Sequence, residues 1–269
     1  QYIFAGIGSY YVQLTIISGS SLQPCTDTEG YWINVFESPT LTISGTEPSC
    51  FGYSDGSIDV TATGGTPNYE YSINGGTTWQ SSNVFSNLAA GNYTIDIEDD
   101  NDCTNDVTIT ITEPTQLTNT STFTEPSCFG DTDGSIDITT TGATPNYEYS
   151  IDGGNTWQTS NIFSNLAAGN YTIDVEDDND CPDVINVTVT EPTILSVSIS
   201  NTTNVSCFGM SDGEVTINAT GATPNYEYSI NGGAWQSSNI FSNLAAGTYT
   251  IDVEDAFDCT DNITVTITE

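Results

Sequence analysis

Cysteines and carboxylates are the only side chains in this sequence whose types and spacing could support reactive chemistry. The 269 residues include 7 cysteines and 36 acidic residues, but no Lys, Arg or His. Without histidine or lysine, the common general bases and activated nucleophiles of enzymes cannot be assembled. Paired carboxylates remain, but near-identical tandem copies with their acids mostly on turns do not indicate one shaped catalytic cleft. We therefore expect no enzymatic activity.

The cysteines recur at regular positions along the chain. They include no CxxC motif and have no histidine to join them, so they favour disulfides in an oxidising exterior over a zinc site. One class precedes the first core strand expected in each repeat, and the other lies in the hairpin before the last strand. The first class is Cys50, Cys128 and Cys207, and the second is Cys25, Cys103, Cys181 and Cys259.

Short acidic hairpins concentrate hard oxygen ligands of the kind that Ca²⁺ accepts. The candidate ligands are Asp99, Asp100, Asp102, Asp177, Asp178 and Asp180. The third copy of this hairpin has Ala256 and Phe257 in place of two polar residues, and no EF-hand spacing occurs. Solvated turns are therefore the preferred interpretation. Calcium stays the alternative, and no other cofactor is expected.

The charge balance excludes several kinds of partner. The formal net charge is −36, with no basic side chain to neutralise phosphate groups. Binding to nucleic acid and attraction to anionic lipid are both disfavoured by Coulomb repulsion. The most apolar stretch, residues 3–17, is interrupted by glycines and polar residues, so we expect no membrane insertion.

Internal repeats dominate the sequence. The tetrapeptide Ser-Cys-Phe-Gly begins at Ser49, Ser127 and Ser206, at steps of 78 and 79 residues. A unit of this length can bury its own core, whereas shorter repeats must stack on their neighbours. Each repeat is therefore expected to fold as a domain.

Period-two alternation predicts the strands of each repeat, because neighbouring side chains in a strand point to opposite faces. Further short strands are expected near residues 41–44, Trp79 and residues 84–85, which gives about seven strands and an immunoglobulin-like sandwich. Tyr93 fits a tyrosine corner, with a plain core position as the alternative. In the first repeat the inward rows are Ile58, Val60 and Ala62; Tyr69, Tyr71 and Ile73; Tyr93, Ile95 and Ile97; and Val107, Ile109 and Ile111.

The predicted fold class is all-β, with tandem immunoglobulin-like antiparallel β-sandwich repeats arranged end to end. Residues 40–115, 116–193 and 194–269 form the three repeats. Residues 1–39 are predicted to be the C-terminal half of a divergent immunoglobulin-like domain, because residues 8–12 parallel residues 91–95. The chain is thus expected to be a piece of a longer protein.

Two disulfide patterns are compatible with this fold. The two cysteine classes should lie at opposite ends of a sandwich, roughly 25 Å apart, whereas the Cα atoms of a disulfide lie within about 7 Å. Bridges between adjacent repeats would leave Cys25, Cys103 and Cys207 to partners outside the sequence. These bridges are Cys50 with Cys181 and Cys128 with Cys259. The alternative is pairing within repeats, as Cys50 with Cys103, Cys128 with Cys181, and Cys207 with Cys259.

The repeat motifs resemble a known family. Each repeat has Ser-Cys-Phe-Gly, Ser-Asp-Gly or Thr-Asp-Gly, Thr-Pro-Asn-Tyr-Glu-Tyr-Ser, Leu-Ala-Ala-Gly-x-Tyr-Thr-Ile-Asp and a late Asp-Cys. Over about residues 46–269 this pattern resembles the SprB repeat of bacterial gliding adhesins. The resemblance implies a cell-surface protein exported by type IX secretion, with a role in adhesion or gliding motility.

We therefore expect an extracellular adhesin or surface-filament segment. Expected partners are a surface polysaccharide or abiotic surface, other copies in a filament and, by the resemblance, the motility machinery of the cell surface. The alternative function is carbohydrate binding by accessory modules of a secreted polysaccharide-degrading enzyme. Tyr69, Tyr71 and Trp79 could stack on sugars in that case, although the two tyrosines share an inward row with Ile73.

Overall fold

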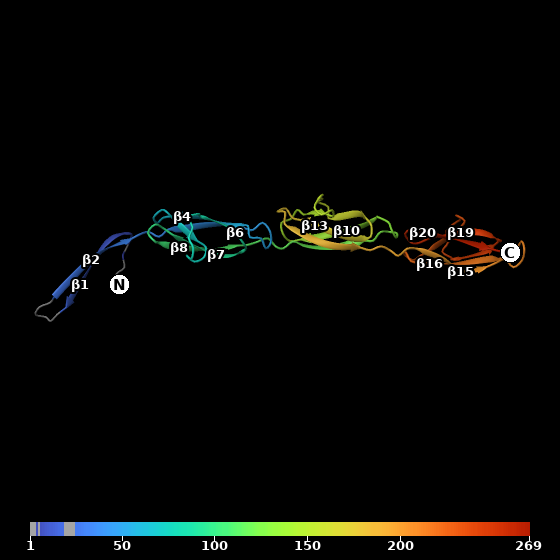
Figure 1. The fold of residues 1–269 in the computed structure, drawn as a ribbon, viewed down its shortest axis with the longest axis horizontal. Coiled ribbons are helices and arrows are strands. Elements are labelled where there is room, and N and C mark those ends of the chain that lie inside the picture. The colour runs from blue at the N-terminus through green and yellow to red at the C-terminus, as the bar shows by residue number, and fades with distance from the viewer. Residues whose placement is uncertain (1–3, 5, 19–24) are drawn as a thin grey trace. The chain divides into compact units, whose positions relative to one another are not determined.

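The computed structural model describes residues 4, 6–18 and 25–269. Every regular element in the described residues is a β-strand, and the fold class is all-β as predicted. Nowhere in those ranges does a helix reach the length and apolarity needed to cross a lipid bilayer. The chain forms two compact units, residues 1–116 and 117–269. Figure 1 colours the chain from blue at the N-terminus to red at the C-terminus.

The first unit begins with an antiparallel pair of long strands, β1 (Gly8–Ser18) and β2 (Cys25–Val35). The Tyr10 hydroxyl donates to the Gly6 carbonyl at 2.9 Å. Large apolar side chains on this pair are open to solvent, with Trp32 69% exposed. The loop between the strands, residues 19–24, lies outside the described residues.

The rest of the first unit is a sandwich of two three-stranded antiparallel sheets, β3–β4–β6 and β5–β7–β8. Ile58, Val60, Ile95 and Ile97 are at most 1% exposed and form the centre of the core between them. The strands are β3 (Thr40–Thr46), β4 (Gly56–Thr63), β5 (Glu70–Ser72), β6 (Val84–Leu88), β7 (Gly91–Glu98) and β8 (Thr104–Ile111).

The second unit contains two further sandwiches of the same topology. The sheets of the first are β12–β10–β9 and β11–β13–β14, and those of the second are β15–β16–β18 and β17–β19–β20. Each sandwich has its own core cluster, so one core does not run through both. The strands are β9 (Thr118–Thr124), β10 (Gly134–Thr141), β11 (Glu148–Ser150), β12 (Ile162–Leu166), β13 (Gly169–Glu176), β14 (Pro182–Val189), β15 (Ser196–Thr203), β16 (Gly213–Thr220), β17 (Glu227–Ile230), β18 (Ile240–Leu244), β19 (Gly247–Glu254) and β20 (Thr260–Ile267).

The predicted inward rows are confirmed. Along β4, Ile58 and Val60 are buried while Asp59 and Thr61, which alternate with them, are exposed. The same alternation continues in β7, where Ile95 and Ile97 are fully buried. Period-two patterning therefore located the core strands, because each sheet has one face on the core and one in water.

The expectation of about seven strands is wrong by one, since each sandwich has six. The segment near Trp79 forms a single bridge, Tyr71 with Gln80. The chain turns directly after this bridge, where the Gln80 side-chain Nε2 donates to the carbonyls of Ser82 and Val84 at 2.8 and 3.0 Å. Pairing with Tyr71 therefore stops at this single bridge.

The tyrosine corner is confirmed in each sandwich. The Tyr93 hydroxyl donates to the Ala89 carbonyl at 2.8 Å, four residues back. The equivalent bonds run from Tyr171 to Ala167 at 2.9 Å and from Tyr249 to Ala245 at 3.0 Å. Each bond holds the turn that precedes the long strand β7, β13 or β19.

Replacing Tyr93 with Phe should lower the stability of the first sandwich by about 1 kcal/mol, the usual net contribution of one hydrogen bond. Amide hydrogen exchange in β7 and β8 measures this sandwich alone. Tyr53→Phe, at a residue 46% exposed, is the matched control and should change little. Equal exchange in the two variants would mean that the corner contributes no stability.

Candidate functional site

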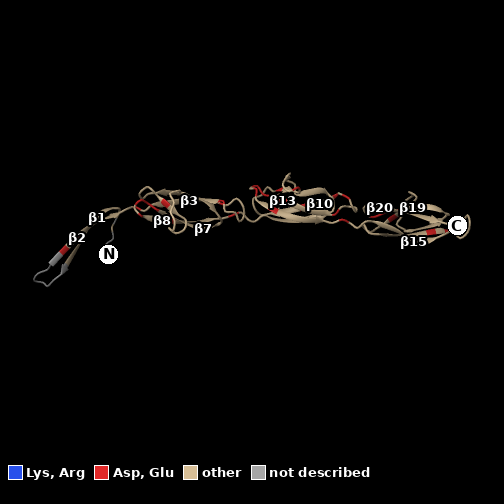
Figure 2. Cartoon of the chain, viewed as in Figure 1, with Lys and Arg blue, Asp and Glu red and all other residues tan. Residues whose placement is uncertain are grey.

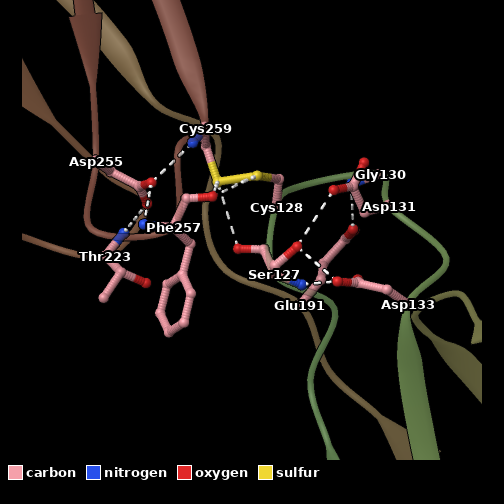
Figure 3. Close-up of a disulfide and its surroundings, with 10 residues drawn as sticks. All are labelled: Ser127, Cys128, Gly130, Asp131, Asp133, Glu191, Thr223, Asp255, Phe257 and Cys259. Carbon is pink, nitrogen blue, oxygen red and sulfur yellow. Dashed lines mark hydrogen bonds between the residues drawn. A yellow bond between two sulfur atoms is a disulfide. The ribbon is translucent and has the colours of Figure 1, made fainter.

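A disulfide inside the second unit joins its two sandwiches. Cys128 and Cys259 are bonded, with their Cα atoms 5.6 Å apart and a sequence separation of 131 (Figure 3). Cys128 lies in the loop before β10, and Cys259 ends the hairpin between β19 and β20. We call residues 127–133 the early cysteine loop and residues 255–259 the late cysteine hairpin, and use the same names for their repeat equivalents.

The early cysteine loop is held closed by its own polar groups. The Ser127 amide donates to Asp133 Oδ1 at 2.9 Å, and its hydroxyl donates to Asp133 Oδ2 at 2.7 Å. These bonds, the Ser127 hydroxyl first, hold the pKa of the Asp133 carboxyl below its ordinary value. The Asp131 amide also donates to the Cys128 carbonyl at 3.1 Å. Cys128 therefore projects from a preformed turn.

A glutamate that follows the last strand of the sandwich is hydrogen-bonded to this loop, at the start of the linker. Gly130 donates its amide to Glu191 Oε2 at 2.7 Å, and Gly52 donates to Glu113 in the same way at 2.6 Å. Glu191 and Glu113 directly precede the prolines of the two linkers. Each linker thus begins at a residue already bonded to the early cysteine loop of its own repeat.

The late cysteine hairpin is organised by one buried carboxylate. Asp255 is 4% exposed and accepts amide hydrogen bonds from Thr223 at 2.8 Å, Phe257 at 2.9 Å and Cys259 at 2.9 Å (Figure 3). Burial acts to raise the pKa of this carboxyl, but the three backbone donors outweigh it and lower the pKa overall. The hairpin shape, and with it the direction of Cys259, depends on this side chain.

The same carboxylate recurs in the other repeats. Asp99 accepts from the amides of Thr66, Asn101 and Cys103 at 2.8, 2.9 and 3.0 Å. Asp177 has three such donors at 2.8, 2.9 and 2.9 Å. Sequence reasoning missed this role, although an acid four residues before Cys103, Cys181 and Cys259 was a usable signal.

The six aspartates considered as calcium ligands lie in these hairpins, and two of them serve as the buried carboxylate. Asp99 and Asp177 are each 4% exposed and turned toward backbone donors, so they act as turn-forming residues. Asp102 and Asp180 occupy the left-handed region with φ of 58° and 57°. Asp100 and Asp178 are exposed. No group of three potential metal ligands occurs among the described residues. Calcium binding stays the untested alternative.

The junction between the two sandwiches also contains a recess of about 320 Å³, lined in part by Phe129, Leu195 and the disulfide. The Cys259 sulfur lies 3.4 Å from the Ser127 carbonyl oxygen. The linker is fixed here because the Ala222 amide donates to the Thr193 carbonyl at 2.7 Å. A Cβ on Gly221 would lie 2.1 Å from the Ile194 carbonyl, so this approach requires glycine.

The observed bond decides between the two disulfide patterns for the second unit. Cys128 is bonded to Cys259, so the alternatives Cys128 with Cys181 and Cys207 with Cys259 are wrong. Cys103 and Cys207 carry free thiols, so Cys50 with Cys103 is wrong as well. Cys50 and Cys181 lie in different units, and the bridge between them stays a prediction. The side chain of Cys25 lies outside the described residues.

The aromatic residues proposed for sugar stacking already have contacts within the protein. Tyr71 is 6% exposed and belongs to the core, and the Tyr69 hydroxyl donates to the Gly64 carbonyl at 2.5 Å. Trp79 is half-buried, and its ring covers Gly76. Two equivalent tyrosines line a polar groove of about 560 Å³ in the second repeat, formed by Asn146, Tyr147, Glu148, Tyr149, Thr159, Asn161, Asp177, Asp178 and Asp180.

Comparison with known families identifies the repeats. The family model described as SprB repeat matches residues 42–78, 120–156 and 199–234. The chain carries three SprB repeats. Each match covers the early cysteine loop and ends before the late cysteine hairpin, so it is shorter than the resemblance expected from the sequence. No curated protein matches the chain.

Solved structures with a similar arrangement of strands are immunoglobulin-like and fibronectin-like tandem domains. The three N-terminal domains of the highly immunogenic outer capsid protein of bacteriophage RB49 share 13% identity over 86% of this chain and 96% of theirs, with a TM-score of 0.37. Eight immunoglobulin domains of Down syndrome cell adhesion molecule share 11% identity over 97% and 40%, with a TM-score of 0.34. Fibronectin(III)-like modules of Clostridium thermocellum CbhA share 16% identity over 55% and 94%, with a TM-score of 0.25.

Facing carboxylates beside the late cysteine hairpins make stability depend on pH. Glu70 pairs directly with Glu98, Glu148 with Glu176, and Glu227 with Glu254 across their strands. Desolvation and then neighbouring acids raise the pKa of Glu98, Glu176 and Glu254. Like charges directly opposite each other destabilise a sheet. Figure 2 shows acidic residues on every sandwich, with no Lys or Arg to offset them.

The melting temperature should therefore reach its maximum in mildly acidic solution. As the pH falls from 7 through the raised pKa values of these glutamates, their repulsion is neutralised and stability increases. Below about pH 4, the ordinary value for Asp, stability falls because Asp99, Asp133 and Asp255 have lowered pKa values and lose their charge-assisted bonds. A melting temperature that only declined from pH 7 downward would contradict this balance.

Replacing Asp255 with Asn should destabilise the third sandwich by roughly 2–4 kcal/mol, because an amide offers one acceptor oxygen where the carboxylate serves three buried donors. Hydrogen exchange in β19 and β20 measures the loss. Asp258→Asn removes the same charge from an exposed position of the same hairpin and is the matched control. Similar losses in both variants would indicate that charge alone, and not the three bonds, is responsible.

Proposed function

We propose that this chain is a segment of an extracellular adhesin or surface filament, in which the repeats act as a mechanical spacer and disulfides limit its extension. The SprB repeats and the immunoglobulin-like fold support the general part of this proposal, a structural repeat protein of surface-adhesin type. SprB repeats occur in cell-surface proteins, and disulfides fit an oxidising exterior. A role in gliding motility and export by type IX secretion are part of the proposal.

The Cys128–Cys259 disulfide is the observation that carries this proposal. It connects two sandwiches instead of closing one, and it encloses residues from both. When the chain is pulled from its two ends, tension therefore passes through the disulfide and bypasses the residues between the two cysteines. The enclosed strands can unfold without adding to the length of the chain.

The proposed partners follow from the composition. A chain with 36 carboxylates and no cation presents no surface for phosphate groups, and its adhesive target is proposed to be a surface polysaccharide or an abiotic surface. Other copies in a filament and the motility machinery of the cell surface are proposed as structural partners. These partners would be held at a distance set by the number of repeats.

The carbohydrate-binding alternative rests on the polar groove of the second repeat. Two of its polar groups are already used, because the Tyr147 hydroxyl donates to the Gly142 carbonyl at 2.7 Å and the Asn161 side-chain Nδ2 donates to the Ile138 carbonyl at 2.7 Å. Tyr149 is 5% exposed and cannot present a ring face to a sugar. The spacer function is therefore the better supported of the two.

Single-molecule pulling of the chain should show a longer final extension after reduction. The disulfide bypasses 131 residues, and at most about 3.4 Å per residue this amounts to roughly 450 Å of hidden length. A larger gain is expected if Cys50 is also bridged to Cys181. Cys103→Ser is the control and should leave the oxidised extension unchanged. If oxidised and reduced chains reach the same length, the extension-limiting function is wrong.

A further inference from the structure

The loop that follows β5, β11 or β17 carries an Asn-Gly or Asp-Gly pair in every repeat. The first residue of each pair is exposed, and each glycine lies in the left-handed region with φ of 68°, 75° and 68°. A Cβ built on any of these glycines would meet no atom within 4 Å, so the surroundings of the pair are open. The three pairs, in chain order, are Asn74-Gly75, Asp152-Gly153 and Asn231-Gly232.

The second repeat shows this loop with a carboxylate. Asp152 Oδ1 accepts from the Ser150 hydroxyl at 2.8 Å and from the amides of Asn155 and Thr156 at 3.0 and 2.9 Å. Asp152 Oδ2 accepts from the Thr156 hydroxyl at 2.7 Å. These bonds, that of the Thr156 hydroxyl first, lower the pKa of Asp152 to about 2. The carboxylate is therefore ionised at neutral pH.

The first repeat holds an amide in the same set of partners. Asn74 Oδ1 accepts from the Ser72 hydroxyl and from the Thr78 amide, both at 3.0 Å. Asn74 Nδ2 donates to the Thr78 hydroxyl at 2.8 Å. If an oxygen replaced Nδ2, the Thr78 hydroxyl would only have to turn its hydrogen toward that oxygen, as the Thr156 hydroxyl does toward Asp152. The loop is thus already built for an aspartate.

We propose that Asn74 and Asn231 are sites of spontaneous deamidation, and that the conversion of Asn74 gives the first repeat the carboxylate loop that the second repeat already has. Glycine has no Cβ beside its nitrogen and adopts many backbone angles, so ring closure onto the preceding Asn is little hindered. This chemical modification goes beyond the proposed spacer function and does not depend on it.

The conversion needs only water as a reactant. The Gly75 nitrogen loses its proton and attacks Asn74 Cγ, the Cγ–Nδ2 bond breaks, and the departing nitrogen takes up a proton and leaves as ammonia. Water then adds to one of the two carbonyls of the cyclic imide, whose bond to the Gly75 nitrogen breaks. Addition at Cγ gives aspartate, and addition at the main-chain carbonyl gives isoaspartate. One water is consumed and one ammonia is released, without oxidation or reduction.

The two sites should differ in their products. An ionised carboxylate is a poor electrophile, so an aspartate held by Ser72 and Thr78 re-forms the imide slowly and accumulates. The third repeat lacks this set of partners, because its loop is one residue shorter and has Ala234 directly before the tryptophan. Asn231 Oδ1 instead accepts from the Thr250 amide at 2.9 Å. The ratio of aspartate to isoaspartate should therefore be higher at position 74 than at position 231.

The test incubates the full chain in heavy-oxygen water at mildly alkaline pH and maps it with pepsin in acid, which stops the reaction. Asn74 and Asn231 should each lose ammonia and gain one heavy oxygen. Asn155, which is exposed in the same loop of the second repeat but is followed by Thr156, is the internal control and should keep its amide. Conversion of Asn74 no faster than that of Asn155, or equal product ratios at positions 74 and 231, would overturn the proposal.

The reverse substitution tests the loop itself. Asp152→Asn creates a third Asn-Gly pair, which should return to aspartate with the same heavy-oxygen label. Before it does, the Thr156 amide should exchange its hydrogen several-fold faster than in the unsubstituted chain, because a bond to a carboxylate is about twice as strong as one to a neutral acceptor. Asp152→Gln, with one more methylene, is the matched control and should keep its amide. An Asp152→Asn chain that also kept its amide would contradict the proposal.

Discussion

Three backbone amides that converge on one buried carboxylate are the interaction on which the junction inside the second unit depends. Asp99, Asp177 and Asp255 each close a hairpin whose last residue is a cysteine. A buried carboxylate without donors would be strongly unfavourable, so the loop has one conformation in which all three amides point inward. The direction of the cysteine follows from that conformation. In the second unit this places Cys259 against the loop that carries Cys128.

A chain without cations must stabilise itself in other ways. No Asp or Glu can form a salt bridge with Lys, Arg or His, because the sequence has none of these residues. Carboxylates instead accept from backbone amides and hydroxyls, as Asp133 does from Ser127 and Glu191 from Gly130. These bonds are local and shape loops. The remaining acids repel one another, which gives covalent bonds between repeats a role that ion pairs have in other proteins.

The sequence predicted the core better than the site. Alternating residues such as Ile58 and Val60 located the strands because burial on one face is a strong, periodic signal. The seventh strand was wrong because a side-chain bond from Gln80 ends pairing after one residue, which periodicity cannot detect. The role of Asp99 was missed because an acidic turn has the same composition whether its carboxylate faces water or backbone donors. Only the fold brings Thr66 to within hydrogen-bond distance of Asp99.

The position of the Cys128–Cys259 bond explains why a bridge between repeats is useful in a chain whose repeats already have cores of their own. A bond inside one sandwich would add stability only to that sandwich. This bond closes a loop of 131 residues and reduces the entropy of the unfolded chain by an amount worth about 4–5 kcal/mol in the loop-entropy account. It also keeps the ends of the loop together after either sandwich unfolds. The unfolded segment therefore remains near its folded neighbour, where it can refold once the load is removed.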